Sequence, residues 1–228
     1  MISFNSLKDP DTDKIISACN SLIGAKIRIK YELELPDGSK TQGNIDNCNI
    51  IGDIMENILS PVLKKNIPTI KEGPKQSSPD FYNREYEWEL KCFKGSPAFD
   101  ISNFISYITQ LTDTTGVKRK LFQTQYLIFK YSISSSFVTI KDFKSCSVYD
   151  LIGYTSKYPI TLQNKKGTWY NIRPCSFDNI GIAKSPKLFI KKICEAISEC
   201  PNEISDKEGK IKNIKNQFCQ LVVADTVC

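Results

Sequence analysis

The stretch Pro79–Phe93, which reads PDFYNREYEWELKCF, decides the fold that we predict for this chain. Side chains of a β-strand point alternately to its two faces. If Tyr86–Phe93 is a strand, its apolar residues face a core and its charged residues face the other way. The apolar set is Tyr86, Trp88, Leu90 and Cys92, and the charged set is Glu85, Glu87, Glu89 and Lys91. Glu89 and Lys91 then share one face, next to Asp80 if Asp80 ends a neighbouring strand.

Asp80, Glu89 and Lys91 are side chains suited to metal-assisted hydrolysis. Two carboxylates can hold a hard cation such as Mg²⁺, which keeps several of its waters. A lysine beside them can position or deprotonate one of these waters, as hydrolysis of a phosphodiester requires. The alternative is an ordinary half-exposed strand, because alternating charge is its usual pattern and a neighbouring glutamate and lysine then form a solvated pair.

The composition narrows the chemistry. The chain has 228 residues, of which 40% are hydrophobic, and this suits one domain with a proper core. The net charge of +6 is compatible with a polyanionic partner, although an AT-rich genome would also enrich lysine. The absence of histidine excludes Ser-His-Asp triads, Cys-His proteases, HNH-type nucleases and histidine-ligated zinc.

The cysteines and the apolar runs bear on the cellular compartment. The nine cysteines include no C-x-x-C pair and are odd in number, so we expect reduced thiols. We expect neither a signal peptide at Met1–Leu22 nor a transmembrane helix, because no apolar run approaches about 18 residues. These features predict a cytoplasmic protein.

The N-terminal part reads as a helix followed by a hairpin. Asp11 or Thr12 caps a helix that runs to about Leu22. Lys26–Leu35 alternates apolar and charged residues, which predicts one amphipathic strand. The turn Pro36–Ser39 and a return strand near Lys40–Asn44 complete the hairpin, which we expect on the outside or at a dimer interface.

The central part combines helices with a buried strand. Asn49–Lys65 is a helix with Glu56 at the edge of its apolar stripe, where a solvated flank position is the alternative to a catalytic one. We expect Asp100 to cap a helix over Asp100–Thr112. Gln125–Ser132 is a continuous apolar run, which predicts a central strand covered on both faces.

The C-terminal part shows further elements. They are a strand over Phe137–Phe143, a short helix in Cys146–Ile152, a hairpin of Ile160–Gln163 with Thr168–Ile172, a helix from Ser185-Pro186 to about Ser198, and a helical tail after Glu203.

Two polar loops could contact a nucleic acid. Pro74–Pro79 contains lysine, glutamine and serine, which suit phosphate and base-edge contacts, although composition alone favours a plain loop. Arg173–Asn179 is irregular and polar. Arg173 could pair bidentately with guanine or form a surface ion pair.

The order of these stretches resembles a known family. Pro79-Asp80 with Glu89-Leu90-Lys91 is similar to the PD-(D/E)xK motif of type II restriction endonucleases. Gly73–Phe81 and Asp53–Asn57 resemble the glutamine-containing loop and the metal-site helix of EcoRV-like blunt cutters. Phe99–Phe104, Tyr126–Phe129 and Trp169–Pro174 resemble the NlaIV/NgoBV restriction endonuclease family.

The resemblance implies a fold and a function. The fold is α/β and restriction-endonuclease-like, with a mixed β-sheet flanked by helices. We expect a single domain with an N-terminal helix and hairpin for dimerisation (1–48), a catalytic core (49–200) and a helical tail (201–228). The implied function is Mg²⁺-dependent double-strand cleavage of DNA by a homodimer at a short palindrome, GGNNCC with blunt ends in this family. A bacterial host and a cognate DNA methyltransferase go with it.

The resemblance also implies residue roles. Asp80 and Glu89 ligate Mg²⁺, Glu56 completes the site or holds a second ion, and Lys91 contacts the phosphate and the attacking water. DNA contacts come from one groove through Lys75, Gln76, Ser77 and Ser78, and from the other through Asn171, Arg173, Ser176 and Asn179.

One departure from the pattern leaves a choice of residue. Few residues separate Asp80 from Glu89, so a tight turn is needed at Tyr82–Arg84, and Glu87 becomes an alternative to Glu89. We prefer Glu89 because it alone is followed by x-Lys. Two other functions stay open: a structure-specific repair or recombination nuclease of the same fold, and a non-catalytic DNA-binding module.

Overall fold

A six-stranded mixed sheet forms the centre of the computed structural model, which describes residues 11–45, 47–74, 79–83, 86–112, 124–134, 136–182 and 185–222. The strand order is β1-β9-β8-β6-β5-β4. The strands are β1 (Lys26–Arg28), β4 (Lys71–Glu72), β5 (Phe81–Asn83), β6 (Tyr86–Lys94), β8 (Thr124–Ser134) and β9 (Phe137–Ser147). β6 and β8 run parallel and the other neighbours antiparallel, which confirms the predicted mixed sheet.

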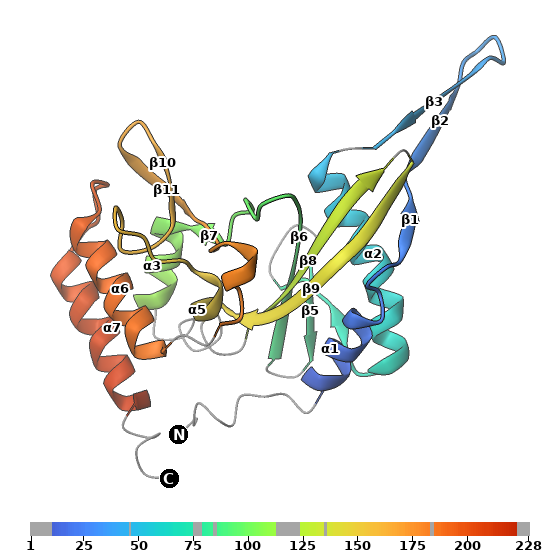
Figure 1. Ribbon diagram of the computed structural model, residues 1–228. Helices are drawn as coiled ribbons and strands as arrows, with labels where there is room; N and C mark the ends of the chain where they lie inside the picture. The colour runs from blue at the N-terminus through green and yellow to red at the C-terminus, as the bar shows by residue number, and fades with distance from the viewer. Residues whose placement is uncertain are drawn as a thin grey trace.

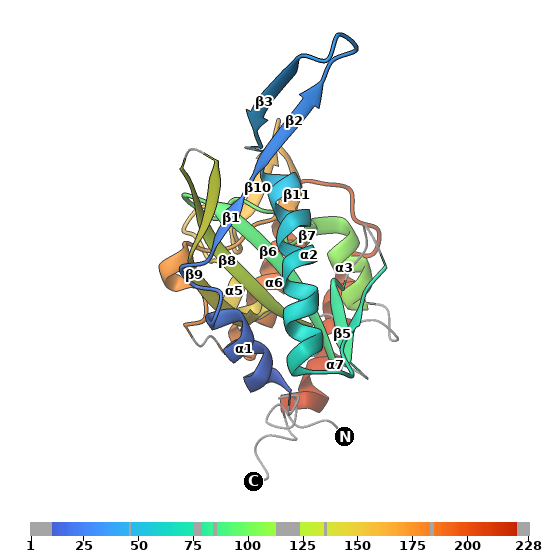
Figure 2. The same cartoon turned by 90° about the vertical axis from the view of Figure 1, so that its right-hand side faces the viewer.

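Helices cover both faces of this sheet (Figures 1 and 2). On one face lie α1 (Thr12–Asn20) and α2 (Cys48–Asn66), and on the other lie α3 (Phe104–Thr112), α5 (Val148–Leu151) and α6 (Pro186–Glu199), with α7 (Lys207–Val222) packed on α6. Leu127 and Phe129 of β8 enter the core of the first face, and Tyr126 and Ile128 enter the core of the second. The prediction of a central strand covered on both faces is therefore confirmed.

Two hairpins extend from this core toward the same end of the molecule, at the top of Figure 1. One consists of β2 (Lys30–Glu34) and β3 (Lys40–Asn44). The other consists of β10 (Leu162–Lys165) and β11 (Thr168–Ile172), and β11 also pairs with β7 (Ser102–Asn103). The short 3₁₀ helix η2 (Phe177–Asn179) follows. Both hairpins were predicted.

The first predicted strand, Lys26–Leu35, is in fact two strands. Its first part pairs with β9, and the register ends where Arg28 lies across from Phe137. Ile29 follows with its side chain 1% exposed in the core, and its amide donates to the carbonyl of Ser136 (2.8 Å). The chain then leaves the sheet as β2, so the alternating pattern of one stretch serves two different sheets.

The prediction of a helix beginning at Asp100 is wrong. α3 begins at Phe104, and the Asn103 side chain accepts a hydrogen bond from the Ser106 amide (3.1 Å). Asp100 instead forms an ion pair with Arg173 (3.0 Å). Asn103 therefore caps this helix, and Asp100 pairs instead with Arg173 in the loop after β11.

Two further features concern the cysteines and the length of the apolar helices. Cys19, Cys92, Cys194 and Cys200 are free thiols. Among the described residues, no helix is long and apolar enough to cross a membrane.

Candidate active site

The hairpin of β5 and β6 sets Asp80 opposite Glu89. The register pairs Phe81 with Trp88 and Asn83 with Tyr86, so one step further along brings Asp80 across from Glu89. Tyr82 and Asn83 of the predicted turn at Tyr82–Arg84 lie in β5, and position 84 is outside the described residues. Glu87 lies across from Tyr82 instead.

Gly73 holds the backbone before Asp80 in place. Its amide donates to the Asp80 carbonyl (2.8 Å). A Cβ atom at position 73 would collide with the Pro79 carbonyl oxygen, which is backbone and cannot move aside by a rotamer change. Glycine is therefore required where the chain approaches the Pro-Asp step.

One hydrogen bond holds the Asp80 carboxylate, and another pairs Glu89 with Lys91. The amide of Leu90 donates to Asp80 Oδ2 (2.5 Å), and Lys91 Nζ donates to Glu89 Oε1 (2.7 Å). The Lys91 side chain is 23% exposed and that of Glu89 is 13% exposed. This ion pair is thus far less solvated than a surface pair. Glu87, in contrast, accepts a hydrogen bond from the Thr124 hydroxyl (3.2 Å).

Glu89 has an unused oxygen that fits a cation. Its Oε2 is buried and has no hydrogen-bond partner within the described residues. A buried carboxylate oxygen without a donor is costly, because it has lost water and gained nothing in return. Asp80 and Glu89 together supply hard oxygen ligands, the kind that Mg²⁺ prefers. The pair therefore fits a divalent ion better than it fits a purely structural role.

Burial and neighbouring charges shift the pKa values of Asp80 and Lys91. Burial, followed by the charge of Glu89, raises the pKa of Asp80 to about 7, against the hydrogen bond from Leu90. Burial alone would lower the pKa of Lys91, but the charge of Glu89 and its hydrogen bond raise it, so Lys91 stays an ammonium group. Perturbed carboxylates beside a charged lysine are typical of catalytic sites.

Glu56 faces the same site from α2 without joining the pair directly. Burial, and then the charge of Asp53, raise the pKa of Glu56, with smaller effects from Lys91 and Glu89. Within the described residues, no group of three or more Asp, Glu, Cys or His side chains is arranged to hold a metal ion. Asp80, Glu89 and Glu56 thus do not form a preassembled three-carboxylate group.

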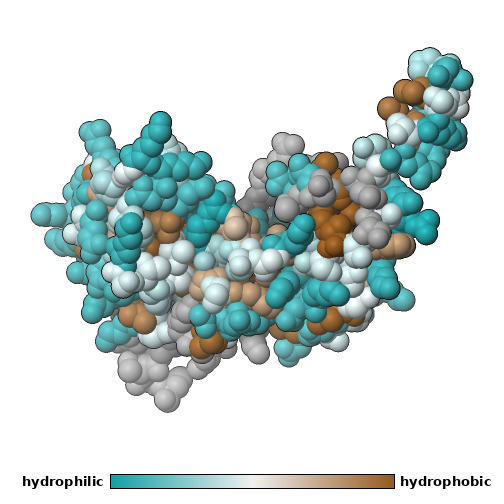
Figure 3. Space-filling view, turned by 45° about the horizontal axis from the view of Figure 1, so that its top comes forward, coloured by the Kyte–Doolittle hydropathy of each residue, from teal (hydrophilic) through white to brown (hydrophobic). Residues whose placement is uncertain are grey.

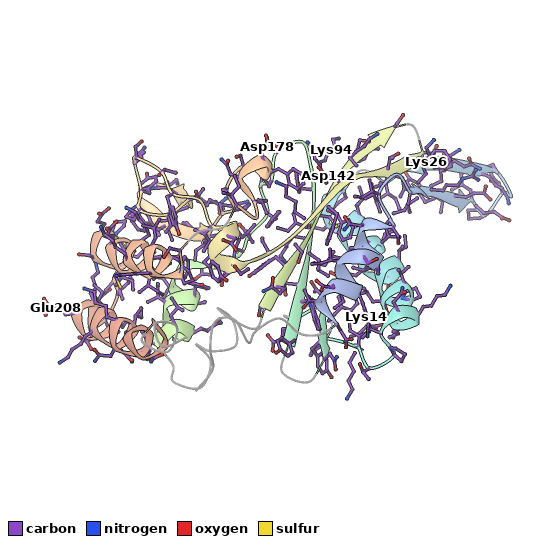
Figure 4. The ribbon with its side chains drawn as sticks, turned by 60° about the horizontal axis from the view of Figure 1, so that its bottom comes forward. Lys14, Lys26, Lys94, Asp142, Asp178 and Glu208 are labelled. Carbon is purple, nitrogen blue, oxygen red and sulfur yellow. The ribbon has the colours of Figure 1, made fainter. Side chains whose placement is uncertain are left out.

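A cleft of about 590 Å³ opens beside these residues. Its walls come from both sides of the molecule: Asn49, Gly52, Asp53 and Glu56 of α2, Leu90–Lys94 of β6, Ser96 and Ala98–Asp100 after it, and Arg173 after β11. Figure 3 shows a depression between these two sides of the molecule. Figure 4 shows Lys94 at the end of β6. Lys94 adds a positive charge to the cleft, and the sequence did not indicate a role for this residue.

Of the expected DNA contacts, Lys75, Gln76, Ser77 and Ser78 lie outside the described residues. Arg173 lines the cleft and pairs with Asp100, so the surface-pair alternative and the cleft position are both realised. Asn171 lies in β11, where its Nδ2 donates to Gln163 Oε1 (3.3 Å).

Ser176 and Asn179 flank and end the η2 segment, and both are exposed. They line a smaller cavity of about 410 Å³, which also includes Pro174, the residue after Arg173. Lys144 of β9 fixes this segment, because its Nζ donates to the carbonyls of Phe177 (2.8 Å), Asp178 (3.2 Å) and Ile180 (3.1 Å). Sequence reasoning missed Lys144, since its partners are backbone atoms more than 30 positions away.

Comparison with known proteins identifies the family. The model of the NgoBV restriction endonuclease family matches residues 14–224, nearly the whole chain. The chain belongs to this family. Type II restriction enzyme NlaIV of Neisseria lactamica is 29% identical over 167 residues, which are 67% of this chain and 67% of that protein. The solved NlaIV restriction endonuclease matches with a TM-score of 0.69 at 24% identity, over 91% of this chain and 87% of that one, and so supports the fold.

Membership of the NgoBV family settles the class of enzyme. The relatives are type II restriction enzymes, which are site-specific deoxyribonucleases. The suspected NlaIV/NgoBV resemblance and the restriction-endonuclease-like fold are therefore confirmed, and DNA is the substrate that this family implies.

Proposed function

We propose that this chain cuts both strands of duplex DNA at a short palindrome, as a homodimer that requires Mg²⁺. The observation that carries the proposal is the set of Asp80, Glu89 and Lys91, of which Lys91 lines the cleft, together with a buried Glu89 oxygen that has no donor within the described residues. A binding module needs neither a partly buried Glu-Lys pair nor a carboxylate oxygen kept without a partner.

In this proposal, Asp80 and Glu89 hold the cation and Glu56 supports it from α2. A bound divalent ion supplies Lewis acidity to the scissile phosphate and lowers the pKa of a water. Lys91 stabilises the charge that develops on the phosphate oxygens, because Glu89 keeps it protonated and directed into the cleft. The Leu90 amide holds the Asp80 carboxylate in a fixed orientation.

DNA contacts beyond the catalytic residues are also part of the proposal. Arg173 lines the cleft just after β11, Asn171 lies in β11, and Ser176 and Asn179 are exposed in the next loop, which suits contacts from one groove. The 75–78 segment leads directly into Pro79-Asp80 and would approach from the other groove. GGNNCC, cut to blunt ends, is the first site to test, and a cognate methyltransferase would protect it in the host.

The β2–β3 hairpin is the proposed dimer contact. Tyr31, Leu33 and Leu35 are 54%, 52% and 42% exposed on one face of it, and Figure 3 shows hydrophobic side chains on this projection. The opposite face is occupied by ion pairs of Lys40 with Glu32 (2.9 Å) and Glu34 (3.5 Å). A palindromic site has two-fold symmetry, which two copies of the chain with one cleft each would match. In this proposal the second copy covers the apolar face of the hairpin.

Digestion of a sequenced plasmid tests the proposal. The purified protein is incubated with Mg²⁺ or with EDTA, and the fragment ends are sequenced. We expect discrete Mg²⁺-dependent fragments that end at one palindrome, and their loss in Lys91→Ala. Lys64→Ala is a matched control. Lys64 also forms an ion pair with a glutamate, Glu72 (2.6 Å), but it lies at an exposed position on α2.

Other outcomes separate the remaining functions. A Mg²⁺-dependent smear would indicate a nuclease that reads structure rather than sequence. Tight binding without cleavage, across several salts and DNA substrates, would refute catalysis and leave a binding module.

A further inference from the structure

The segment 151–177, which contains the β10–β11 hairpin, carries positive charge and no negative charge. It holds Lys157, Lys165, Lys166 and Arg173, and no aspartate or glutamate. The whole chain has 31 basic and 25 acidic residues, so a stretch of this length without an acid concentrates the net charge. A polyanion would be attracted to this part of the surface.

The three lysines are exposed and keep their charge unneutralised. None of the ion pairs found in the described part of the chain involves Lys157, Lys165 or Lys166. Lys165 Nζ lies 5.3 Å from the ring centre of Tyr170, and Lys157 Nζ lies 5.3 Å from that of Tyr158. A cation over an aromatic ring is partly ordered without losing its charge, so less entropy is lost when it binds an anion.

The tip of the hairpin has a defined shape. Lys166 and Gly167 have φ angles of 52° and 82°, the conformation of a tight hairpin turn, and the Gly167 amide donates to Asn164 Oδ1 (3.0 Å). Asn164 Nδ2 in turn donates to the Tyr158 hydroxyl (3.2 Å). The two adjacent lysines are therefore presented on a fixed turn.

The hairpin is also anchored to the body. The Trp169 amide donates to Asn202 Oδ1 (2.9 Å), and Asn202 Nδ2 donates to the Trp169 carbonyl (2.7 Å). The Trp169 ring packs edge-on against Phe104 (5.6 Å) and Tyr158 (5.5 Å). Because these contacts fix the hairpin to the rest of the protein, its lysines lie at a fixed position relative to the cleft.

The base of the arm reaches the cleft itself. β11 ends at Ile172, and the next residue, Arg173, lines the cleft that contains Lys91. The hairpin projects from there toward the end of the molecule at the top of Figure 1. We propose that the β10–β11 hairpin is an arm that binds the phosphate backbone of DNA flanking the cut, through Lys165 and Lys166 at its tip and Lys157 beside it.

This inference rests on the proposed function in one respect, namely that DNA binds in the cleft. Phosphate is the favoured ligand, because an ammonium group acts as a point charge and the turn offers no fork for reading a base edge. The arm should thus contribute affinity that is independent of sequence and sensitive to salt, while discrimination comes from other loops.

The salt dependence of binding tests the arm directly. The full-length protein is titrated, in EDTA, against a fluorescent duplex that lacks GGNNCC, over salt concentrations from about 50 to 200 mM. The variant is Lys165→Gln with Lys166→Asn, since asparagine tolerates the positive φ at position 166. The matched control is Lys212→Gln with Lys215→Gln, two exposed lysines of α7, the helix that Figure 4 places at the outer edge with Glu208.

We expect the slope of log Kobs against log salt to become shallower by about 2 in the arm variant and to stay unchanged in the control. Lys165→Arg with Lys166→Arg should restore the wild-type slope. In cleavage assays, the arm variant should raise KM and leave kcat unchanged. Thermal melting of each variant establishes that it is folded.

The results separate the arm from the enzyme. An unchanged slope in the folded arm variant, or an equal loss in the control, would overturn the arm even if the wild type cuts DNA. A shallower slope in a wild type background that binds but never cleaves would support the arm and refute the proposed catalysis. A wild type without any salt-dependent DNA binding would overturn both.

Discussion

Phe93 packs against Phe177 with ring centres 5.2 Å apart. Phe93 is two residues after Lys91 on β6, and Phe177 lies in η2 beside the exposed Ser176. The strand that bears the catalytic candidates therefore contacts the loop that bears DNA-contact candidates. Lys144 strengthens this contact, because its Nζ lies 4.8 Å from the Phe177 ring centre in addition to binding the loop carbonyls.

Replacing Lys144 should therefore release the η2 loop. Lys144→Met removes a charged donor from three carbonyls, and we expect the free energy of unfolding to fall by about 2–3 kcal/mol. Denaturant unfolding measures this loss. Lys141→Met, at an exposed position of the same strand, is the control and should change stability by less than about 0.5 kcal/mol. Equal losses in both variants would show that the carbonyl contacts contribute nothing.

Glu89 and Glu87 differ in ways that predict different effects on cleavage. Glu89 pairs with Lys91 and has a buried oxygen without a hydrogen-bond partner within the described residues, whereas Glu87 accepts a hydrogen bond from Thr124. We expect Glu89→Gln to reduce kcat at least about 10²–10³-fold, the usual loss when one charge-stabilising group is removed. Glu87→Gln is the matched control and should stay within about threefold of the wild type. Plasmid cleavage under single-turnover conditions compares them, and a larger loss in Glu87→Gln would reverse the assignment.

The strands of the central sheet were predictable because their pattern is local. β8 is a run of apolar residues between polar ends, and its burial on both faces follows directly from that run. The same reasoning failed at Ile29, where one alternating stretch crosses from the six-stranded sheet to the β2–β3 hairpin. Alternation gives the face that a side chain takes, but not which sheet a strand joins, because that depends on where its partner strand ends.

The candidate site was predictable in part for a similar reason. Asp80, Glu89 and Lys91 are close in sequence, so a hairpin suffices to bring them together. The pair of Asp100 with Arg173 and the contacts of Lys144 join residues far apart in the chain. Single residues of these types carry no signal of their partners, and only the tertiary packing of the chain brings them into contact.

The raised pKa of Asp80 predicts that stability depends on pH. The pKa is raised from 3.8 to about 7, so folding favours the protonated carboxyl. Its contribution to stability is fully present below pH 3.8 and is lost as the pH rises through about 7. Asp80→Asn stays neutral, so in EDTA its stability relative to the wild type should increase from pH 5 to pH 8. Because Asp80 is only partly buried, we expect a gain of about 1–2 kcal/mol rather than the full value.

Chemical denaturation at the two pH values measures this difference. Asp178→Asn is a suitable control, because Asp178 is exposed on η2. A relative stability of Asp80→Asn that is flat with pH, or that falls as pH rises, would contradict the raised pKa. Mg²⁺ should reduce the difference, because a bound cation favours the ionised carboxylate.

The apolar face of the β2–β3 hairpin predicts the behaviour of the oligomer. Leu33 is 52% exposed, and the Tyr31 ring lies over Gly43 on the other strand, where a Cβ atom would collide with it. Burial of Leu33 in a dimer contributes about 1.5–3 kcal/mol per copy to the free energy of association. A charged residue at position 33 removes this contribution, and two-fold symmetry doubles the loss. We expect Leu33→Asp to weaken dimerisation about 100-fold or more, as measured by sedimentation equilibrium. Lys40→Gln alters the opposite, ion-paired face and should leave the dimer intact. If Leu33→Asp stays dimeric, the two copies meet elsewhere, and the hairpin is free to contact DNA instead.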